Sequence, residues 1–235
     1  MNMSLPSSVH LLVDPATLPA ATEDHFDPEW LNRQQLVVGT AKGRGTVYFF
    51  RAGPATWVLR RYWRGGWIGR FNRERYLWRG LEATRPWREW RLLAALRAQG
   101  LPVPRPIAAR VRRSGLTYRG DLITERIEPA VPFGALLAAG VVAREDWVKV
   151  GRLLAQFQAH GVRHDDINVS NVLRDEHGRY HLIDFDKAKL ARDGGWKERN
   201  LARFQRSIEK LRTRNPAVVF GPAEWDALLD GYRGM

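Results

Sequence analysis

The pattern of apolar and polar positions divides the chain into a strand-rich part followed by a helix-rich part. Runs of β-branched and aromatic residues bounded by turn residues predict strands at residues 35–39, 46–50, 55–62, 101–111 and 118–129. A helix is predicted at residues 85–100, with Pro86 in its first turn and Gly100 at its end. The first part is therefore expected to be an antiparallel sheet with one helix inserted after its third strand.

Helical spacing dominates after Pro129. Amphipathic helices are predicted at residues 144–160 and 199–213, and an apolar run that ends in acids is predicted to be a strand at 180–186. We therefore predict an α+β fold of two lobes, with a ligand-binding cleft between them. The expected division is an irregular lead-in at residues 1–34, an N-lobe with an antiparallel sheet and one helix at 35–128, and a mainly helical C-lobe at 129–235.

Charge and cysteine content narrow the possible functions. The chain has no Cys, which excludes disulfides and thiolate metal sites. Its longest uncharged apolar stretch, residues 134–143, is too short to span a bilayer, so we expect a cytoplasmic protein that is soluble or peripheral to a membrane. The net charge is +13, and residues 41–120 hold 19 Lys and Arg against 3 Glu. A general preference for Arg would not explain this clustering, which predicts a basic face for an anionic partner.

The segment HDDINVSNVL, residues 164–173, places many hydrogen-bonding side chains in an apolar frame. His164, Asp166 and Asn171 have the spacing H-x-D-x-x-x-x-N, and Asp184 follows in the next apolar run. Phosphoryl transfer from ATP needs a carboxylate that orients and deprotonates the attacking hydroxyl, here Asp166. It also needs oxygen ligands that hold Mg²⁺ on the nucleotide, here Asn171 and Asp184. A polar turn would explain an isolated H-x-D, but the combined spacing favours a kinase site.

His164 itself has two interpretations. A His–Asp pair can bind Zn²⁺, but such a site needs further His ligands, and the other five His residues do not supply them at a suitable spacing. We therefore expect His164 to support the loop through hydrogen bonds.

Glycines occupy the turn between the first two predicted strands. Backbone amides at Gly43, Arg44 and Gly45 could close over nucleotide phosphates, because glycine lets the backbone approach closely. An ordinary hairpin turn explains these glycines about equally well.

A kinase also needs a cation on the third strand, paired with a Glu on the helix. No Lys lies between Lys42 and position 149, so the candidates are Arg60 and Arg61. Neighbouring strand residues face opposite ways, which allows only one of them to point into the cleft. We predict Arg60, paired with Glu89, the only acid of the predicted helix, and keep Lys42 as the alternative phosphate ligand.

These motifs resemble one family. GTAKGRGTVYF, LRRYWRGG, RYLW, GLPVPRPIAAR, ITERIE, HDDINVSNVL and IDFDKAKL are similar to segments of the 3-deoxy-D-manno-octulosonic acid (Kdo) kinases of Gram-negative bacteria, members of the protein-kinase-like lipopolysaccharide core kinases. The resemblance implies a protein-kinase-like fold and ATP-dependent phosphorylation of the 4-hydroxyl of Kdo on a Kdo–lipid A precursor. It places the reaction at the cytoplasmic face of the inner membrane, and it implies that backbone groups of Glu125 and Ile127 contact adenine.

The chain departs from the protein-kinase pattern in its glycine spacing, in the missing strand Lys and in Asp186, where protein kinases have Gly. Only 49 residues follow Asp186, and no A-P-E occurs among them. That length is too short for an activation segment and a full peptide-binding subdomain. A small or glycolipid acceptor is therefore favoured over a peptide.

Residues 60–80 combine Arg, Trp and Tyr with a single acid, Glu74. Such a segment suits nucleic acid, an anionic bilayer or a phosphorylated glycolipid, whereas individual rings could equally be half-buried core. For the stretch as a whole we predict contact with the inner membrane and its anionic glycolipid, and we disfavour nucleic acid.

Two other functions stay open from the sequence. One is a kinase of the same fold with another acceptor, such as a heptose or an aminoglycoside. The other is a binding protein with an inactive kinase fold or with affinity for nucleic acid, which the intact set of Asp166, Asn171 and Asp184 argues against.

Overall fold

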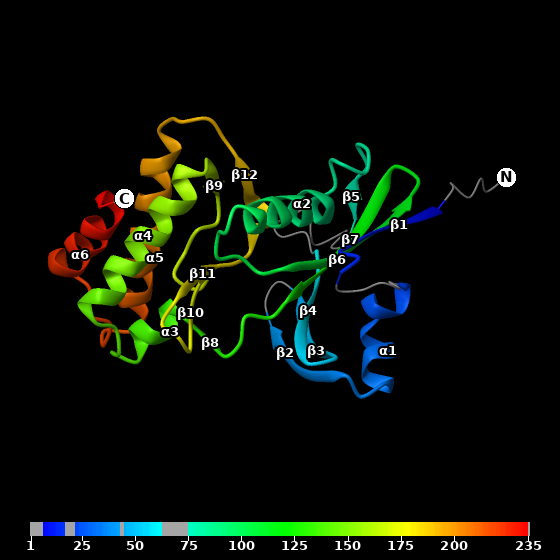
Figure 1. Cartoon of the computed structure of the whole chain (residues 1–235), viewed down its shortest axis with the longest axis horizontal. Helices are drawn as coiled ribbons and strands as arrows, with labels where there is room; N and C mark the ends of the chain where they lie inside the picture. The colour runs from blue at the N-terminus through cyan, green and yellow to red at the C-terminus, as the bar shows by residue number, and fades with distance from the viewer. Residues whose placement is uncertain (1–6, 17–21, 43–44, 63–74, 235) are drawn as a thin grey trace. The chain divides into compact units, whose positions relative to one another are not determined.

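The computed structural model describes residues 7–16, 22–42, 45–62 and 75–234 (Figure 1). Its contacts divide the chain into an N-terminal unit, Met1–Ala95 with Pro104–Arg126, and a C-terminal unit, Leu96–Val103 with Ile127–Met235. The sequence prediction assigned Leu96–Val103 to the N-lobe, and the structure differs there. Leu101 and Val103 are buried, and the Leu182 N–H donates to the Pro102 carbonyl at 3.0 Å, which ties this segment to the C-terminal unit.

The N-terminal unit is built on an antiparallel sheet. Its described strands are β1 (Ser7–Val13), β2 (Val37–Lys42), β3 (Thr46–Ala52), β4 (Ala55–Arg61), β5 (Tyr76–Leu77), β6 (Pro106–Ser114) and β7 (Thr117–Glu125). The order across the sheet is β1-β6-β7-β4-β3-β2, with β5 also paired to β7. Alternation of side chains along each strand gives the sheet two faces with different covers.

One sheet face is covered by residues from the start of the chain. The 3₁₀ helix η1 (Glu23–Phe26) and helix α1 (Pro28–Arg33) bury Phe26 and Leu31 against Trp57 and Leu59 of β4. The strand β1 pairs with β6 from Ser7↔Ser114 to Val13↔Ala108. The irregular lead-in predicted for residues 1–34 is therefore wrong for these segments. They are ordered by pairing and burial against residues far along the chain, which local periodicity does not reveal.

The opposite sheet face carries helix α2 (Arg85–Ala98). The Arg85 backbone N–H donates to the Tyr118 hydroxyl at 3.0 Å, which fixes the first turn of the helix on β7. A side chain at Gly120 would lie 2.6 Å from the Pro86 ring, so only glycine allows this close approach. The anchored first turn directs Glu89, one turn later, toward β4.

The C-terminal unit is mainly helical. Its helices are α3 (Phe133–Ala138), α4 (Arg144–Ala159), α5 (Trp196–Arg214) and α6 (Pro222–Arg233). Its short strands and 3₁₀ turn are β8 (Ala130–Pro132), β9 (Val162–His164), β10 (Val172–Asp175), β11 (Tyr180–Leu182), η3 (Phe185–Lys187) and β12 (Ala188–Leu190). The predicted strand at 180–186 is thus only three residues long, because the chain turns at Asp184. The predicted α+β class is confirmed, with α1, α3 and α6 as helices that the sequence analysis did not predict.

Two glycines let α4 and α6 cross closely. A side chain at Gly151 would meet the Leu228 carbonyl at 1.9 Å, and one at Gly231 would meet the Val148 carbonyl at 2.0 Å. Trp147 and Phe133 are both buried in the same unit. Their rings make an edge-to-face contact with the centroids 5.1 Å apart. This core supports the short strands that carry the polar loop.

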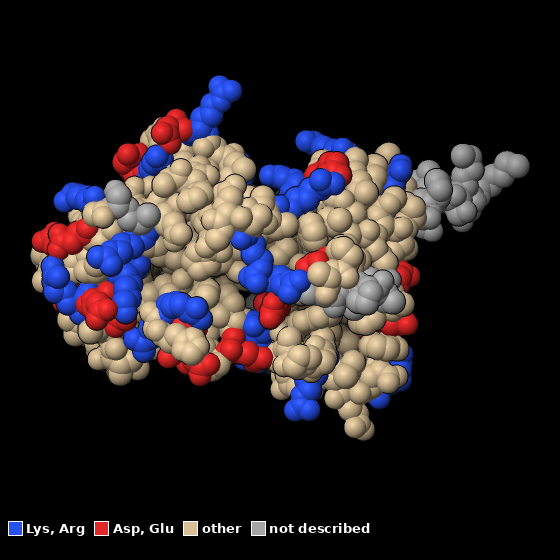
Figure 2. Space-filling view, in the orientation of Figure 1, with Lys and Arg blue, Asp and Glu red and all other residues tan. Residues whose placement is uncertain are grey.

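Charge and hydropathy differ between surfaces. Figure 2 shows Lys and Arg side chains grouped over α2, where Arg88 and Arg91 are exposed and Arg91 pairs with Glu82 at 2.8 Å. Over the C-terminal unit the two signs of charge are interspersed in the same view. Within the described ranges, none of the helices combines the length and apolar character that crossing a bilayer requires.

Candidate active site

His164 organises the polar loop of the C-terminal unit. The Asp166 N–H donates to its Nδ1 at 3.3 Å, so the proton resides on Nε2, which donates to the Ile183 carbonyl at 3.2 Å. The ring is 1% exposed and lies edge-on to Phe185. Burial lowers the pKa of His164, although the bond to Ile183 and the charges of Asp184 and Asp166 oppose the shift. The predicted supporting role is confirmed for a neutral imidazole.

Asp166 is held at its backbone and its carboxylate. Its carbonyl accepts hydrogen bonds from the side-chain amides of Asn168 at 2.8 Å and Asn171 at 3.0 Å. Its Oδ2 accepts from Nζ of Lys187 at 2.9 Å, and both side chains remain about one-third exposed. The Asp165 N–H donates to the Lys187 carbonyl at 3.2 Å, which fixes the backbone beside the pair. The carboxylate is thus oriented and still accessible to a ligand.

Lys187 was not identified from the sequence. It lies 21 residues from Asp166, in η3, and pairing of Ala188 in β12 with His164 in β9 returns it to the loop. A basic residue three positions after Asp184 was the available signal, but only the strand pairing gives it a partner.

Asn171 and Asp184 come together through the backbone. The Asn171 carbonyl accepts a hydrogen bond from the Ile183 N–H at 2.9 Å. This bond brings Asp184, the residue after Ile183, to the loop that contains Asn171. Because Nδ2 of Asn171 is used by the Asp166 carbonyl, its Oδ1 is the atom suited to a metal. Asp184 has φ 63° and ψ 65°, a left-handed conformation that costs energy outside glycine and is typical of functional sites.

This donor set fits magnesium. Mg²⁺ takes oxygen ligands, keeps several waters and is commonly bound by one or two protein side chains plus phosphates. In the part of the chain that the structure describes, no cluster of three or more His, Cys, Asp or Glu forms a metal cage. One amide oxygen and one carboxylate are therefore suited to an ion carried by a nucleotide.

The N-terminal unit contains the predicted cation–carboxylate pair. Arg60 of β4 forms an ion pair with Glu89 of α2, and the Tyr62 hydroxyl also donates to Glu89. Glu89 is 3% exposed, whereas Arg60 is 26% exposed and lies 5.3 Å from the Tyr62 ring centroid. The predicted contact between Arg60 and Glu89 is thus present, and the Arg60 side chain is partly exposed.

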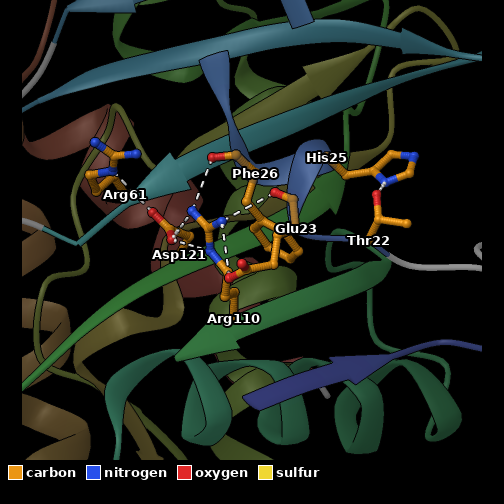
Figure 3. A network of polar contacts seen from close by, with 7 residues as sticks. All are labelled: Thr22, Glu23, His25, Phe26, Arg61, Arg110 and Asp121. Atoms are coloured by element: carbon orange, nitrogen blue, oxygen red, sulfur yellow. Dashed lines mark hydrogen bonds and ion pairs between the residues drawn. The ribbon is translucent and has the colours of Figure 1, made fainter. Parts of the chain in front are cut away.

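Arg61 follows Arg60 in β4 and therefore faces the other side of the sheet, where it belongs to the polar network of Figure 3. Its Nε donates to Oδ1 of Asp121 at 3.1 Å, while Arg110 donates two hydrogen bonds to Oδ2, at 2.8 and 3.0 Å. Arg110 also donates to the carbonyls of Glu23 and Phe26, so this network attaches η1 to β6 and β7. The sequence suggested no partner for Arg61, because Asp121 is 60 residues away.

The remaining predicted residues have no tested role. Gly43 and Arg44 lie outside the described residues, as does most of the stretch 60–80, and Gly45 directly precedes β3. Glu125 ends β7, where its N–H donates to the Arg105 carbonyl at 2.9 Å, and Ile127 begins the C-terminal unit after β7. The alternative cation, Lys42, is the last residue of β2.

Comparison with known proteins tests the predicted family. Residues 28–232 match the lipopolysaccharide kinase (Kdo/WaaP) family. Proteins named 3-deoxy-D-manno-octulosonic acid kinase from Vibrio vulnificus (strain YJ016) and Haemophilus influenzae (strain 86-028NP) are both 40% identical to the chain, and the similarity covers 89% and 92% of each pair of sequences. The protein of that name from Photobacterium profundum is 36% identical over 93% of this chain and 92% of its own. The predicted resemblance is confirmed, and the chain belongs to the lipopolysaccharide kinase (Kdo/WaaP) family.

Proposed function

We propose that this kinase transfers the γ-phosphoryl group of ATP to the 4-hydroxyl of Kdo on a Kdo–lipid A precursor. The observation that carries the proposal is the Asp166 carboxylate, oriented by Lys187 and by a loop that a neutral His164 holds in place. Family membership supports phosphoryl transfer, and the names of the similar proteins support Kdo as the acceptor. The precursor is a lipid, so the proposal places the reaction at the cytoplasmic face of the inner membrane.

Asp166 has the role of general base in this proposal. It accepts the proton of the Kdo hydroxyl as the oxygen attacks the γ-phosphorus, and the bond from that phosphorus to the bridging oxygen of ADP breaks. Lys187 orients the carboxylate in the free enzyme and supplies a positive charge beside the phosphoryl group during transfer. A carboxylate held on one side by an ammonium group needs little reorganisation when the acceptor binds.

Oδ1 of Asn171 and the carboxylate of Asp184 would hold Mg²⁺. When bound, the ion neutralises charge on the nucleotide phosphates. The hydrogen bond between the Asn171 carbonyl and the Ile183 N–H joins the two segments that would supply these ligands.

The N-terminal unit supplies the remaining nucleotide contacts in the proposal. Arg60 would bind phosphate oxygens in the place of the usual Lys, with Glu89 orienting its partly exposed guanidinium. Backbone amides at Gly43, Arg44 and Gly45 would cover the phosphates, and backbone groups of Glu125 and Ile127 would bind adenine. The phosphate contacts follow from the motifs of the sequence, and the adenine contacts follow from the family resemblance.

The test compares two neighbouring carboxylates. Asp166→Asn removes the base without changing side-chain size and should lower kcat by about 10²–10⁴, the range typical of a general base. Asp165→Asn is the matched control, because the Asp165 carboxylate pairs with Arg163 at 2.6 Å instead of with Lys187, and this variant should keep near wild-type activity. Transfer of radiolabelled phosphate from ATP is the readout, with Kdo–lipid A precursor, a heptose acceptor and an aminoglycoside offered in parallel.

Equal activity of the two variants would exclude Asp166 as the base. Phosphorylation of the heptose or the aminoglycoside, with none of the Kdo acceptor, would overturn the acceptor. Mass spectrometry of the product locates the phosphate and tests the 4-hydroxyl directly.

A further inference from the structure

The sheet face covered by η1 and α1 continues beyond that cover. Arg110, under this cover, donates hydrogen bonds to the carbonyls of Glu23 and Phe26. Toward the β6–β7 turn the same face continues with Arg112, which lies opposite Val9 of β1 and Arg119 of β7. Figure 1 shows β1, β5 and the β6–β7 turn side by side at this end of the sheet.

Large apolar side chains are exposed at this end. Leu77 is 59% exposed, Leu116 is 73% exposed and Val9 is 47% exposed. Leu77 and Leu116 are neighbours, because Leu77 pairs with Thr117 and the following N–H, that of Trp78, donates to the Leu116 carbonyl at 2.9 Å. Two protruding leucines beside a tight turn are costly in water and favour an apolar partner.

Positive charge surrounds these leucines. Arg112 and Arg119 are directly opposite on paired strands, so both side chains leave the same face of the sheet. Nε of Arg112 is buried and has no hydrogen-bond partner among the described residues. Burial, followed by the charge of Arg110, lowers the pKa of Arg112, although the charges of Asp121 and Glu23 oppose the shift. The segments 7–13, 75–81 and 106–120 contain no Asp or Glu, so the strands and the turn at this end carry only basic charge, and the acids whose charges reach Arg112 are Asp121 and Glu23.

We propose that this end of the sheet, here termed the β-tip and defined by Val9, Leu77, Arg112, Leu116 and Arg119, docks on an anionic phospholipid bilayer. The two leucines enter the headgroup region, and the arginines bind lipid phosphates. Charge complementarity selects an anionic surface, and the exposed leucines select a bilayer over nucleic acid, whose grooves offer no acyl chains to them. The inference rests on the proposed function, in which the acceptor of the kinase is a membrane glycolipid.

The test measures vesicle binding without ATP or acceptor. The full chain is sedimented with phosphatidylcholine vesicles that contain or lack phosphatidylglycerol. Arg112→Gln/Arg119→Gln should weaken binding to the anionic vesicles by about 25-fold, roughly fivefold for each Arg, and the loss should shrink as salt is added. Leu77→Ser/Leu116→Ser should weaken it on the order of tenfold at every salt concentration.

Controls change the same residue types elsewhere on the N-terminal unit. Arg33→Gln/Arg88→Gln removes the same charge from exposed helix positions, and Val38→Ser alters an exposed apolar residue of β2; both should bind vesicles within about twofold of wild type. Circular dichroism establishes that each variant is folded. The leucine variant keeps the test decisive if the arginine variant fails to fold, because both of its sites are exposed.

Three results would overturn the proposal. One is equal binding of β-tip variants and wild type to anionic vesicles. Another is equal wild-type binding to vesicles with and without phosphatidylglycerol. The third is a β-tip variant that loses duplex DNA binding or self-association while vesicle binding is unchanged. Phosphorylation of detergent-dispersed acceptor, measured in parallel, reports the proposed function without a bilayer, so the two proposals fail separately.

Discussion

Exchanging Arg60 or Arg61 for Gln tests the assignment of the nucleotide cation with two adjacent residues. The side chains leave β4 on opposite faces, Arg60 toward Glu89 and Arg61 toward Asp121. The two changes remove the same charge from neighbouring positions, so any difference between them reflects what each side chain contacts. We expect Arg60→Gln to impair both stability and ATP use, and Arg61→Gln to impair neither strongly.

The magnitude follows from burial and remaining partners. Removing one member of a fully buried ion pair lowers the free energy of unfolding by about 3–5 kcal/mol. Removing one member of an exposed pair lowers it by about 0–1 kcal/mol. Glu89 is 3% exposed but Arg60 is 26% exposed, and the Tyr62 hydroxyl still donates to Glu89 in the variant. We therefore expect Arg60→Gln to lower the free energy of unfolding by about 2 kcal/mol. Arg61→Gln should cost under about 1 kcal/mol, because Asp121 keeps its pairing with Arg110.

Urea denaturation and initial-rate kinetics measure the two effects. A double-mutant cycle with Glu89→Gln should give a coupling of about 1–2 kcal/mol for Arg60 and close to none for Arg61. Loss of a charged hydrogen bond to phosphate should lower kcat/KM for ATP by about 10²-fold in Arg60→Gln only. If Arg60→Gln and Arg61→Gln share the same kinetics, or if Arg60 and Glu89 act additively, the reasoning is refuted.

Further predictions concern the polar loop of the C-terminal unit. Lys187→Met should lower kcat by roughly 10–100-fold with little change in the KM for ATP, and Lys187→Arg should keep part of the rate. The control is Lys189→Met at an exposed position, and equal rates for the two Met variants would contradict the role of Lys187. Burial lowers the pKa of His164, so at mildly acidic pH the unfolded chain binds a proton that the folded chain does not. The free energy of unfolding should therefore fall as the pH drops below about 7, by at most about 1.4 kcal/mol per pH unit. His164→Asn should flatten this slope in denaturation curves, whereas the exposed His177→Asn should leave it unchanged. Asp184→Asn keeps a residue type that tolerates the left-handed backbone and should raise the Mg²⁺ concentration for half-maximal activity by roughly tenfold or more, while chelation of Mg²⁺ by EDTA should abolish wild-type transfer.

Local patterns predicted much of the fold and part of the site. Helical spacing located α2, α4 and α5 to within a few residues, and strand alternation correctly placed Arg60 and Arg61 on opposite faces of the sheet. These predictions succeeded because the deciding interactions repeat at short, regular intervals along the chain.

Other features depend on residues distant in the sequence and were missed. Order in residues 7–13 and 23–33 arises from pairing with β6 and burial against β4. Gly120 is required only because Pro86 lies against it. A scan for periodicity contains no information on either contact, since each joins segments with unrelated local patterns.

The sequence by itself determined the chemistry available to this kinase, namely which side chains can accept a proton, bind a metal or carry positive charge, and at what spacing. Only the tertiary structure decided which of them meet. Lys187 lies beside Asp166 because β12 pairs with β9, and Asp184 lies beside Asn171 because a backbone hydrogen bond joins their segments. Spacing constrains only near neighbours, whereas the free energy of burying and pairing distant segments selects one set of partners out of many.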